Sequence, residues 1–117
     1  MMEQSVASFE LAQIKKDIQL AGPTVLFLRA DWCGACGVAE AVLPQIEGIK
    51  RMHVIDVDHP DVVADSFCAT YDVQNVPTTL IFHKGEKVGH IIGVGVSEDS
   101  YAERMKETLS NVRRRKN

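Results

Sequence analysis

Apolar runs alternate with helical patterns along this 117-residue chain. Residues 24–30 and 52–57 are mainly apolar, which predicts strands covered on both faces, as in a parallel sheet. Apolar positions three or four apart predict helices over residues 8–20, 33–48 and 60–71, the first with Ser8 as its N-cap. The segment Ala21-Gly22-Pro23 is expected to stop the first helix.

The period changes after Pro77. Residues 79–83 and 88–92 predict two strands around a turn at 84–87, where Gly85 takes a positive φ, and Ser97 caps a last helix. This order of elements predicts an α/β fold, a three-layer sandwich whose central mixed sheet is flanked by helices. Residues 1–112 then form a single domain and residues 113–117 a basic tail, while residues 4–7 are a candidate for a short extra strand.

Composition and charge narrow the possible partners. The chain is 45% hydrophobic and 25% charged, which is typical of a globular domain, and its net charge of −3 provides no basic field for nucleic acid. Residues 1–12 lack the charged and apolar regions of a signal peptide, and the longest apolar run, residues 25–28, is too short to span a bilayer. We therefore expect a cytoplasmic protein without a membrane partner.

Two of the three cysteines lie in Trp32-Cys33-Gly34-Ala35-Cys36, where a predicted buried strand gives way to a helix. Cysteines three apart at a helix start face each other, and the first lies among N–H groups without intrahelical partners. The positive end of the helix favours the thiolate form of Cys33, which makes it a nucleophile, whereas Cys36 is placed to resolve a mixed disulfide. A zinc site using both cysteines lacks a second close ligand pair, so we expect no metal.

A second motif, Val76-Pro77-Thr78, precedes a strand, the turn Lys84-Gly85-Glu86 and Gly93. Together with residues 25–36, these features resemble the thioredoxin family over nearly the whole chain. The resemblance implies a cis proline at position 77 that faces the cysteine pair. It also implies that Gly34 and Ala35 support the active site, and that substrate is bound by Trp32, Val76, Pro77 and Gly93.

The same resemblance implies a protein-disulfide reductase that works by dithiol-disulfide exchange, with Cys33 attacking and Cys36 resolving. Its partners would be disulfide-containing client proteins and an electron donor similar to thioredoxin reductase, such as a flavin-dependent reductase or a membrane thiol carrier. A monomer without a cofactor beyond the redox-active pair is expected. Two alternatives stay open: a binding or adaptor module with weak redox activity, and a specialised disulfide oxidase or isomerase.

Several positions depart from the family pattern. Phe27 and Val54 stand where thioredoxins commonly have a buried aspartate and a nearby lysine, which leaves water, with Asp56 as a second candidate, to take the proton of Cys36. Gly34-Ala35 replaces the usual Gly-Pro and predicts a potential less reducing than the roughly −270 mV of thioredoxin. Pro44 predicts a kink displaced by about one turn. A long segment between positions 58 and 77 predicts a lengthened third helix.

Other candidate residues have plainer interpretations. Cys68 is expected to be an inert core thiol. Asp31 and Glu40 flank the cysteine pair, where they either bias which substrate surfaces dock or are solvated charges. The histidines show no metal-site spacing and are expected at the surface or at strand ends: His53, His59, His83 and His90.

Overall fold

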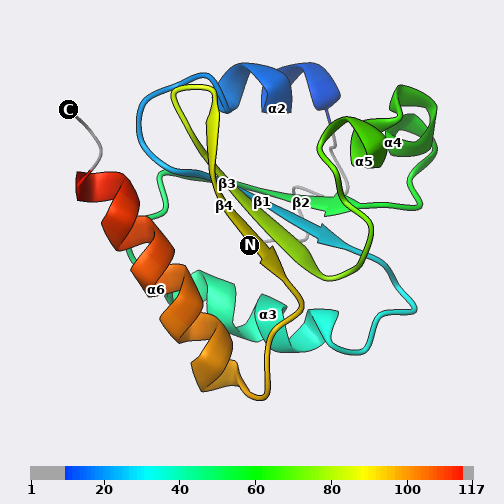
Figure 1. Cartoon of the computed structure of the whole chain (residues 1–117). Coiled ribbons are helices and arrows are strands. Elements are labelled where there is room, and N and C mark those ends of the chain that lie inside the picture. Colours follow the sequence, from blue (N-terminus) through cyan, green and yellow to red (C-terminus); the bar gives the residue numbers. More distant parts are fainter. Residues whose placement is uncertain (1–9, 115–117) are drawn as a thin grey trace.

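A four-stranded sheet with the strand order β2-β1-β3-β4 forms the centre of the molecule (Figure 1). The computed structural model describes residues 10–114. The strands are β1 (Thr24–Arg29), β2 (Arg51–Asp56), β3 (Thr78–His83) and β4 (Glu86–Ile92). Since β1 pairs with β2 in parallel and with β3 antiparallel, the predicted mixed sheet is confirmed.

Helices cover both faces of this sheet (Figure 1). One face carries α2 (Leu11–Asp17), α4 (Pro60–Asp65) and α5 (Phe67–Thr70), and the other carries α3 (Cys36–Val42) and α6 (Glu98–Arg114). Successive side chains of β1 point to opposite faces of the sheet. Val25 and Phe27 belong to the core under α3 and α6, whereas Leu26 and Leu28 belong to the core on the face that carries α2, α4 and α5. The predicted three-layer α/β sandwich is therefore confirmed.

The register brings four chain segments to one end of the sheet. Arg29 at the end of β1 lies opposite Asp56 at the end of β2, and Leu28 lies opposite Thr78 at the start of β3. Thr78 in turn lies opposite Ile92 at the end of β4. The loops that follow β1, β2 and β4 and the loop that precedes β3 therefore meet there.

Three expected helices have different bounds in the structure. The first spans only Leu11–Asp17, and Ser8 and the candidate strand at 4–7 lie outside the described residues. The expected kink at Pro44 is wrong, because α3 ends at Val42 and a 3₁₀ turn, η1 (Leu43–Gln45), contains the proline. The expected long third helix is two short ones, α4 and α5, which Ser66 separates with a left-handed φ of 57°.

The β3–β4 hairpin and α6 agree more closely with the elements predicted from the sequence. The turn between β3 and β4 has only two residues, and both Lys84 (φ 54°) and Gly85 (φ 82°) take the positive φ that tight hairpins favour. Ser97 caps α6, because its Oγ accepts a hydrogen bond from the Ser100 N–H at 3.2 Å. The helix continues to Arg114, so the expected tail boundary at residue 113 falls within it.

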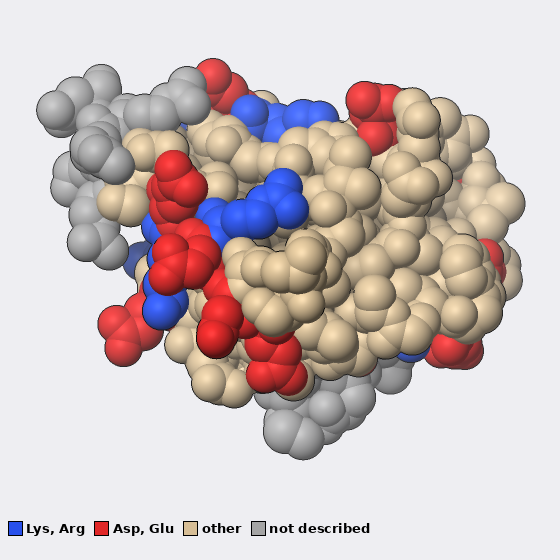
Figure 2. Space-filling model, turned by 60° about the horizontal axis from the view of Figure 1, so that its bottom comes forward, with Lys and Arg blue, Asp and Glu red and all other residues tan. Residues whose placement is uncertain are grey.

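Charge is unevenly spread over the surface. Seen from the side of α3 and α6, the Lys, Arg, Asp and Glu side chains gather mostly in one band, and a broad part of this face has none (Figure 2). Within the described residues, no helix has the length and apolar character needed to cross a bilayer.

Candidate active site

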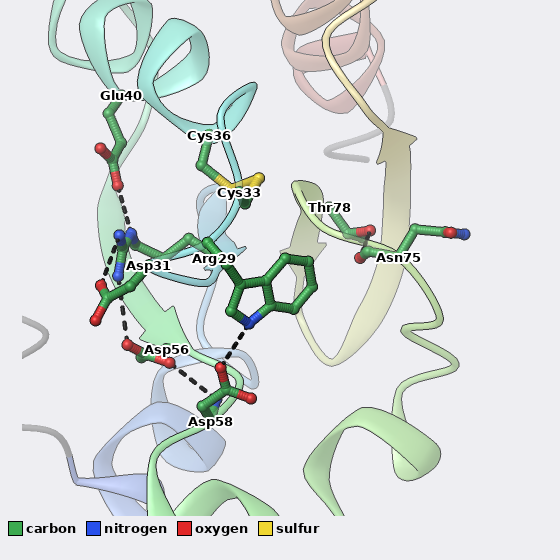
Figure 3. Close-up of a disulfide and its surroundings, with 10 residues drawn as sticks. Arg29, Asp31, Cys33, Cys36, Glu40, Asp56, Asp58, Asn75 and Thr78 are labelled. Atoms are coloured by element: carbon green, nitrogen blue, oxygen red, sulfur yellow. Dashed lines mark hydrogen bonds and ion pairs between the residues drawn. A yellow bond between two sulfur atoms is a disulfide. The ribbon is translucent and has the colours of Figure 1, made fainter.

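A disulfide joins Cys33, in the segment between β1 and α3, to Cys36, the first residue of α3 (Figure 3). Their Cα atoms are 5.5 Å apart. The two residues differ in accessibility, since Cys33 is half-buried and Cys36 is only 1% exposed. Only the first sulfur is thus well placed to meet another molecule. We call the end of the sheet that carries this bond the disulfide end.

A series of tight turns carries the chain from β1 into α3. The Cys33 N–H donates to the Ala30 carbonyl at 3.2 Å, and the Cys36 N–H donates to the Cys33 carbonyl at 3.3 Å. α3 therefore begins at Cys36, three residues later than the sequence predicted. Cys33 lies one turn before this helix. Gly34 and Ala35 are exposed between the two cysteines.

Trp32 lies on the surface next to Cys33, with 72% of its area exposed. Its indole Nε1–H donates to Oδ2 of Asp58 at 2.9 Å, across 26 positions of sequence (Figure 3). Asp58 follows β2, and the parallel pairing of β1 and β2 is what brings the two residues together. Sequence reasoning singled out Trp32 but missed this partner.

The loop before β3 supplies the other side of the site. The Val76–Pro77 peptide bond is cis, as the resemblance implied, and the Pro77 carbonyl accepts a hydrogen bond from the Gly93 N–H at 2.8 Å. Val76, Pro77 and Gly93, three of the residues expected to bind substrate, thus lie next to one another. Val76 and Cys33 both pack against the core beneath α3. A cavity of about 200 Å³ lies between Trp32 and Val76 and is also lined by Cys68.

Arg29, the last residue of β1, joins three carboxylates beside the disulfide (Figure 3). Its guanidinium lies 2.7 Å from Glu40, 3.1 Å from Asp31 and 3.4 Å from Asp56. Burial acts to lower the pKa of Arg29, but the hydrogen bond that it donates to Asp31 and the charges of the three carboxylates outweigh burial and raise this pKa. Asp31 and Glu40 are thus ion-paired rather than simply solvated, through a residue that sequence reasoning missed.

The positions behind the disulfide where a buried aspartate and lysine would stand, on β1 and β2, have apolar side chains. Phe27 is fully buried and Val54 is 2% exposed, so these positions are part of the apolar core. Asp56, the second candidate for the proton of Cys36, is bound to Arg29 and accepts a hydrogen bond from the Asp58 N–H at 2.8 Å. Both contacts direct its carboxylate toward groups other than Cys36.

Cys68 is half-buried rather than fully buried, at the edge of the core under α2. Burial, followed by the charge of Asp58, raises the pKa of its thiol. This shift disfavours the thiolate, which agrees with the expected low reactivity. The position beside the 200 Å³ cavity was not expected.

The four histidines lie at separate places in the fold. His53 bonds Asp17 at 2.7 Å, and His83 accepts a hydrogen bond from the Gly22 N–H at 3.0 Å. His83 also lines a cavity of about 400 Å³ at the opposite end of the sheet from the disulfide. Among residues 10–114, no group of three or more His, Cys, Asp or Glu side chains is arranged to hold a metal ion.

Comparison with known proteins gives one consistent result. The Thioredoxin family model matches residues 5–107. A thioredoxin from Porphyra purpurea is 30% identical over 92 residues, which cover 74% of this chain and 78% of that protein. Among solved structures, the crystal structure of thioredoxin from Trypanosoma brucei brucei superimposes with a TM-score of 0.68 at 19% identity, covering 91% of this chain and 88% of that one. Oxidised thioredoxin O2 from Arabidopsis thaliana gives 0.65 at 21% identity, with 86% of each chain covered.

Proposed function

The chain belongs to the thioredoxin family and is a thiol-disulfide oxidoreductase, and from this premise we propose that it reduces protein disulfides, with Cys33 attacking and Cys36 resolving. Members of this family act on disulfide-containing substrates and are returned to the dithiol form by a reductase. The difference in exposure between the two cysteines carries the assignment of roles. The half-buried Cys33 can reach a client, whereas Cys36, at 1% exposure, can reach little besides Cys33.

The proposed reaction is a two-step exchange of sulfur bonds. The Cys33 thiolate attacks one sulfur of the client disulfide, which forms a mixed disulfide and releases the other client sulfur as a thiolate. The Cys36 sulfur, having lost its proton to water, then attacks Cys33 and displaces the second client thiolate. Two electrons pass from the protein to the client, and the two client thiolates take up protons from water.

The local backbone supports Cys33 as the thiolate. Cys33 lies one turn ahead of the first residue of α3, at the end of the helix that carries positive partial charge. Its sulfur is bonded directly to Cys36, so the attacking and resolving atoms need no large movement between the two steps. No cofactor enters this reaction.

The client would lie between Trp32 and the loop before β3. The exposed indole provides one wall, and Val76, Pro77 and Gly93 provide the other. Gly93 has a positive φ of 72°, and a Cβ added there would have open space within 4 Å, so a client backbone can pass close to it. An electron donor similar to thioredoxin reductase, cytoplasmic location and a monomeric state belong to the same proposal.

Insulin reduction driven by dithiothreitol tests this function. We expect turnover that Cys33→Ser abolishes, and we expect Cys36→Ser to retain a single attack that traps a mixed disulfide. Cys68→Ser is the matched control, because it removes a thiol outside the exchanging pair and should leave the rate within about twofold of the parent. Absence of insulin reduction together with retained binding of a client peptide would favour the adaptor alternative.

A further inference from the structure

The sheet register sorts the charged side chains between two ends of the molecule. At the disulfide end, the register brings together Arg29, Asp56, Thr78 and Ile92, and Arg29 is the single Lys or Arg among residues 29–35, 56–61, 71–78 and 92–99, which include the loops at this end. Four acidic residues are placed here by their contacts with Arg29 or Trp32: Asp31, Glu40, Asp56 and Asp58.

The opposite end has the reverse balance. Lys50 and Arg51 lie at the start of β2, and Lys84 and Lys87 lie in or beside the β3–β4 turn. Asp17, Glu47 and Glu86 are the nearby acidic residues, and Asp17 is ion-paired with His53. Although the net charge of the chain is small, the disulfide end is acidic and the far end is more basic.

Arg29 compensates only part of the negative charge beside the disulfide. It contacts Asp31, Glu40 and Asp56, and one guanidinium can balance the charge of only one of these three carboxylates. The Asp31 side chain is 88% exposed, so its carboxylate faces the solvent two residues before Cys33. Asp58 is also exposed, and its carboxylate is held by the indole of Trp32, the residue that precedes Cys33.

Resting on the reductase function above, we propose that this protein prefers client disulfides that are flanked by Lys or Arg. The exchange between Cys33 and the client disulfide fixes where the client binds. The carboxylates of Asp31 and Asp58 then determine which of the clients that reach Cys33 are preferred. A basic client is attracted as it approaches, while an acidic one is repelled. Because both carboxylates are exposed, salt screens this preference strongly, with a Debye length of about 10 Å at 0.1 M ionic strength.

Two synthetic disulfide peptides of the same sequence, one with Lys and one with Glu on both sides of the disulfide, test the preference. The protein is reduced beforehand and separated from the reductant, and the formation of peptide thiols is followed after acid quenching. We expect kcat/KM, measured as a single-turnover rate constant, to favour the Lys peptide about tenfold at 20 mM ionic strength and less than about twofold at 0.5 M.

The double variant Asp31→Asn/Asp58→Asn identifies the residues responsible. Asparagine keeps an oxygen that can accept the indole hydrogen bond, so Trp32 retains its anchor while two charges are lost. We expect the ratio of the two rate constants to fall at least about threefold. A ratio also cancels any change in the intrinsic reactivity of Cys33, since both peptides meet the same nucleophile.

The matched control is Glu47→Gln/Glu107→Gln, which removes the same charge from exposed positions outside the disulfide end. This variant should leave the ratio unchanged. If both peptides are reduced at equal rates at low salt, or if the control lowers the ratio as much as the test variant, the preference is refuted while the reductase function stands. If neither peptide is reduced, the proposed function itself fails.

Discussion

Phe27 on β1 lies directly opposite Val54 on β2, and both side chains are buried in the core beneath α3. Thioredoxins commonly place a buried aspartate and a lysine near these positions. Here, apolar contact stands in place of that pair, so these positions add to the packing of the core and provide no buried proton acceptor for Cys36. We expect the absence of this charged pair to affect how the reactions of the two cysteines depend on pH, and not to affect the fold.

The first prediction is that the reactivity of Cys33 follows a single titration. In a Cys36→Ser/Cys68→Ser background, the rate of alkylation of Cys33 by iodoacetamide should show one inflection between pH 5 and pH 10, because Phe27 and Val54 place no ionisable group behind it. Asp56→Asn should leave the shape of the curve unchanged. A second inflection that disappears in Asp56→Asn would reinstate Asp56 as a coupled proton acceptor.

The second prediction concerns the anchor of Trp32. Asp58→Ala removes the acceptor of the indole N–H, whereas Asp58→Asn retains one. Because this hydrogen bond is exposed, we expect Asp58→Ala to change the free energy of unfolding by only about 0.5 kcal/mol. We expect kcat/KM for insulin reduction to fall severalfold in Asp58→Ala and less in Asp58→Asn. Equal losses in the two variants would show that charge, not the hydrogen bond, matters for insulin.

The third prediction is that Arg29 stabilises the disulfide end. Arg29→Met leaves three carboxylates close together without a cation, and we expect it to lower the free energy of unfolding by about 2 kcal/mol. Arg29→Lys should recover part of this loss, since an ammonium group cannot reach all three partners at once. Urea denaturation at low salt and at 1 M NaCl checks the cause, and a loss that salt does not reduce would argue against an electrostatic origin.

The fourth prediction is an acid-dependent contribution from Asp17. Burial acts to raise the pKa of Asp17, but hydrogen bonds from His53 and Gln13 outweigh it and hold this pKa below the ordinary value of 3.8. A carboxylate with a lowered pKa adds stability that is present above the unfolded pKa and is lost as the pH falls through the folded pKa. Asp17→Asn should therefore destabilise the protein by about 1–2 kcal/mol at pH 7 and much less below pH 3.

Denaturant titrations at both pH values, with Asp65→Asn as the control, test this contribution. Asp65 makes an ion pair with the exposed side chain of Lys15, so its loss should cost less than about 1 kcal/mol. A deficit in Asp17→Asn that is as large at pH 2.5 as at pH 7 would contradict the expected titration.

The fifth prediction concerns the dipeptide between the cysteines. Ala35 has a φ of −68°, which proline adopts without strain. Ala35→Pro should hold the two sulfurs closer to bonding geometry in the reduced form and so favour the disulfide. At about 0.4–1 kcal/mol, this effect corresponds to a potential roughly 10–20 mV more negative. Equilibration with glutathione measures both proteins, and a potential of the parent at or below about −270 mV would contradict the sequence-based expectation.

The strands and the cysteine site were predictable because their signals are local. Apolar runs such as 25–28 identify buried strands, and Gly85 identifies the hairpin turn. The break at Ser66 was missed, since serine carries no preference for the left-handed conformation that it adopts there. The contacts of Arg29 and of Asp58 were also missed, because they join residues up to 27 positions apart and depend on the pairing of β1 with β2.

The convergence of four separate loops at one end of the sheet makes this molecule easy to re-engineer. The strands between those loops hold the apolar core, whereas the loops themselves contribute most of the groups that a client would touch. Exposed loop positions such as Gln74, Asn75 and Val96 can therefore be exchanged with little cost to folding, whereas Val57 and Val94 pack against the core and have to be kept. A small library at the exposed positions offers a direct way to graft new client preferences onto an unchanged cysteine pair.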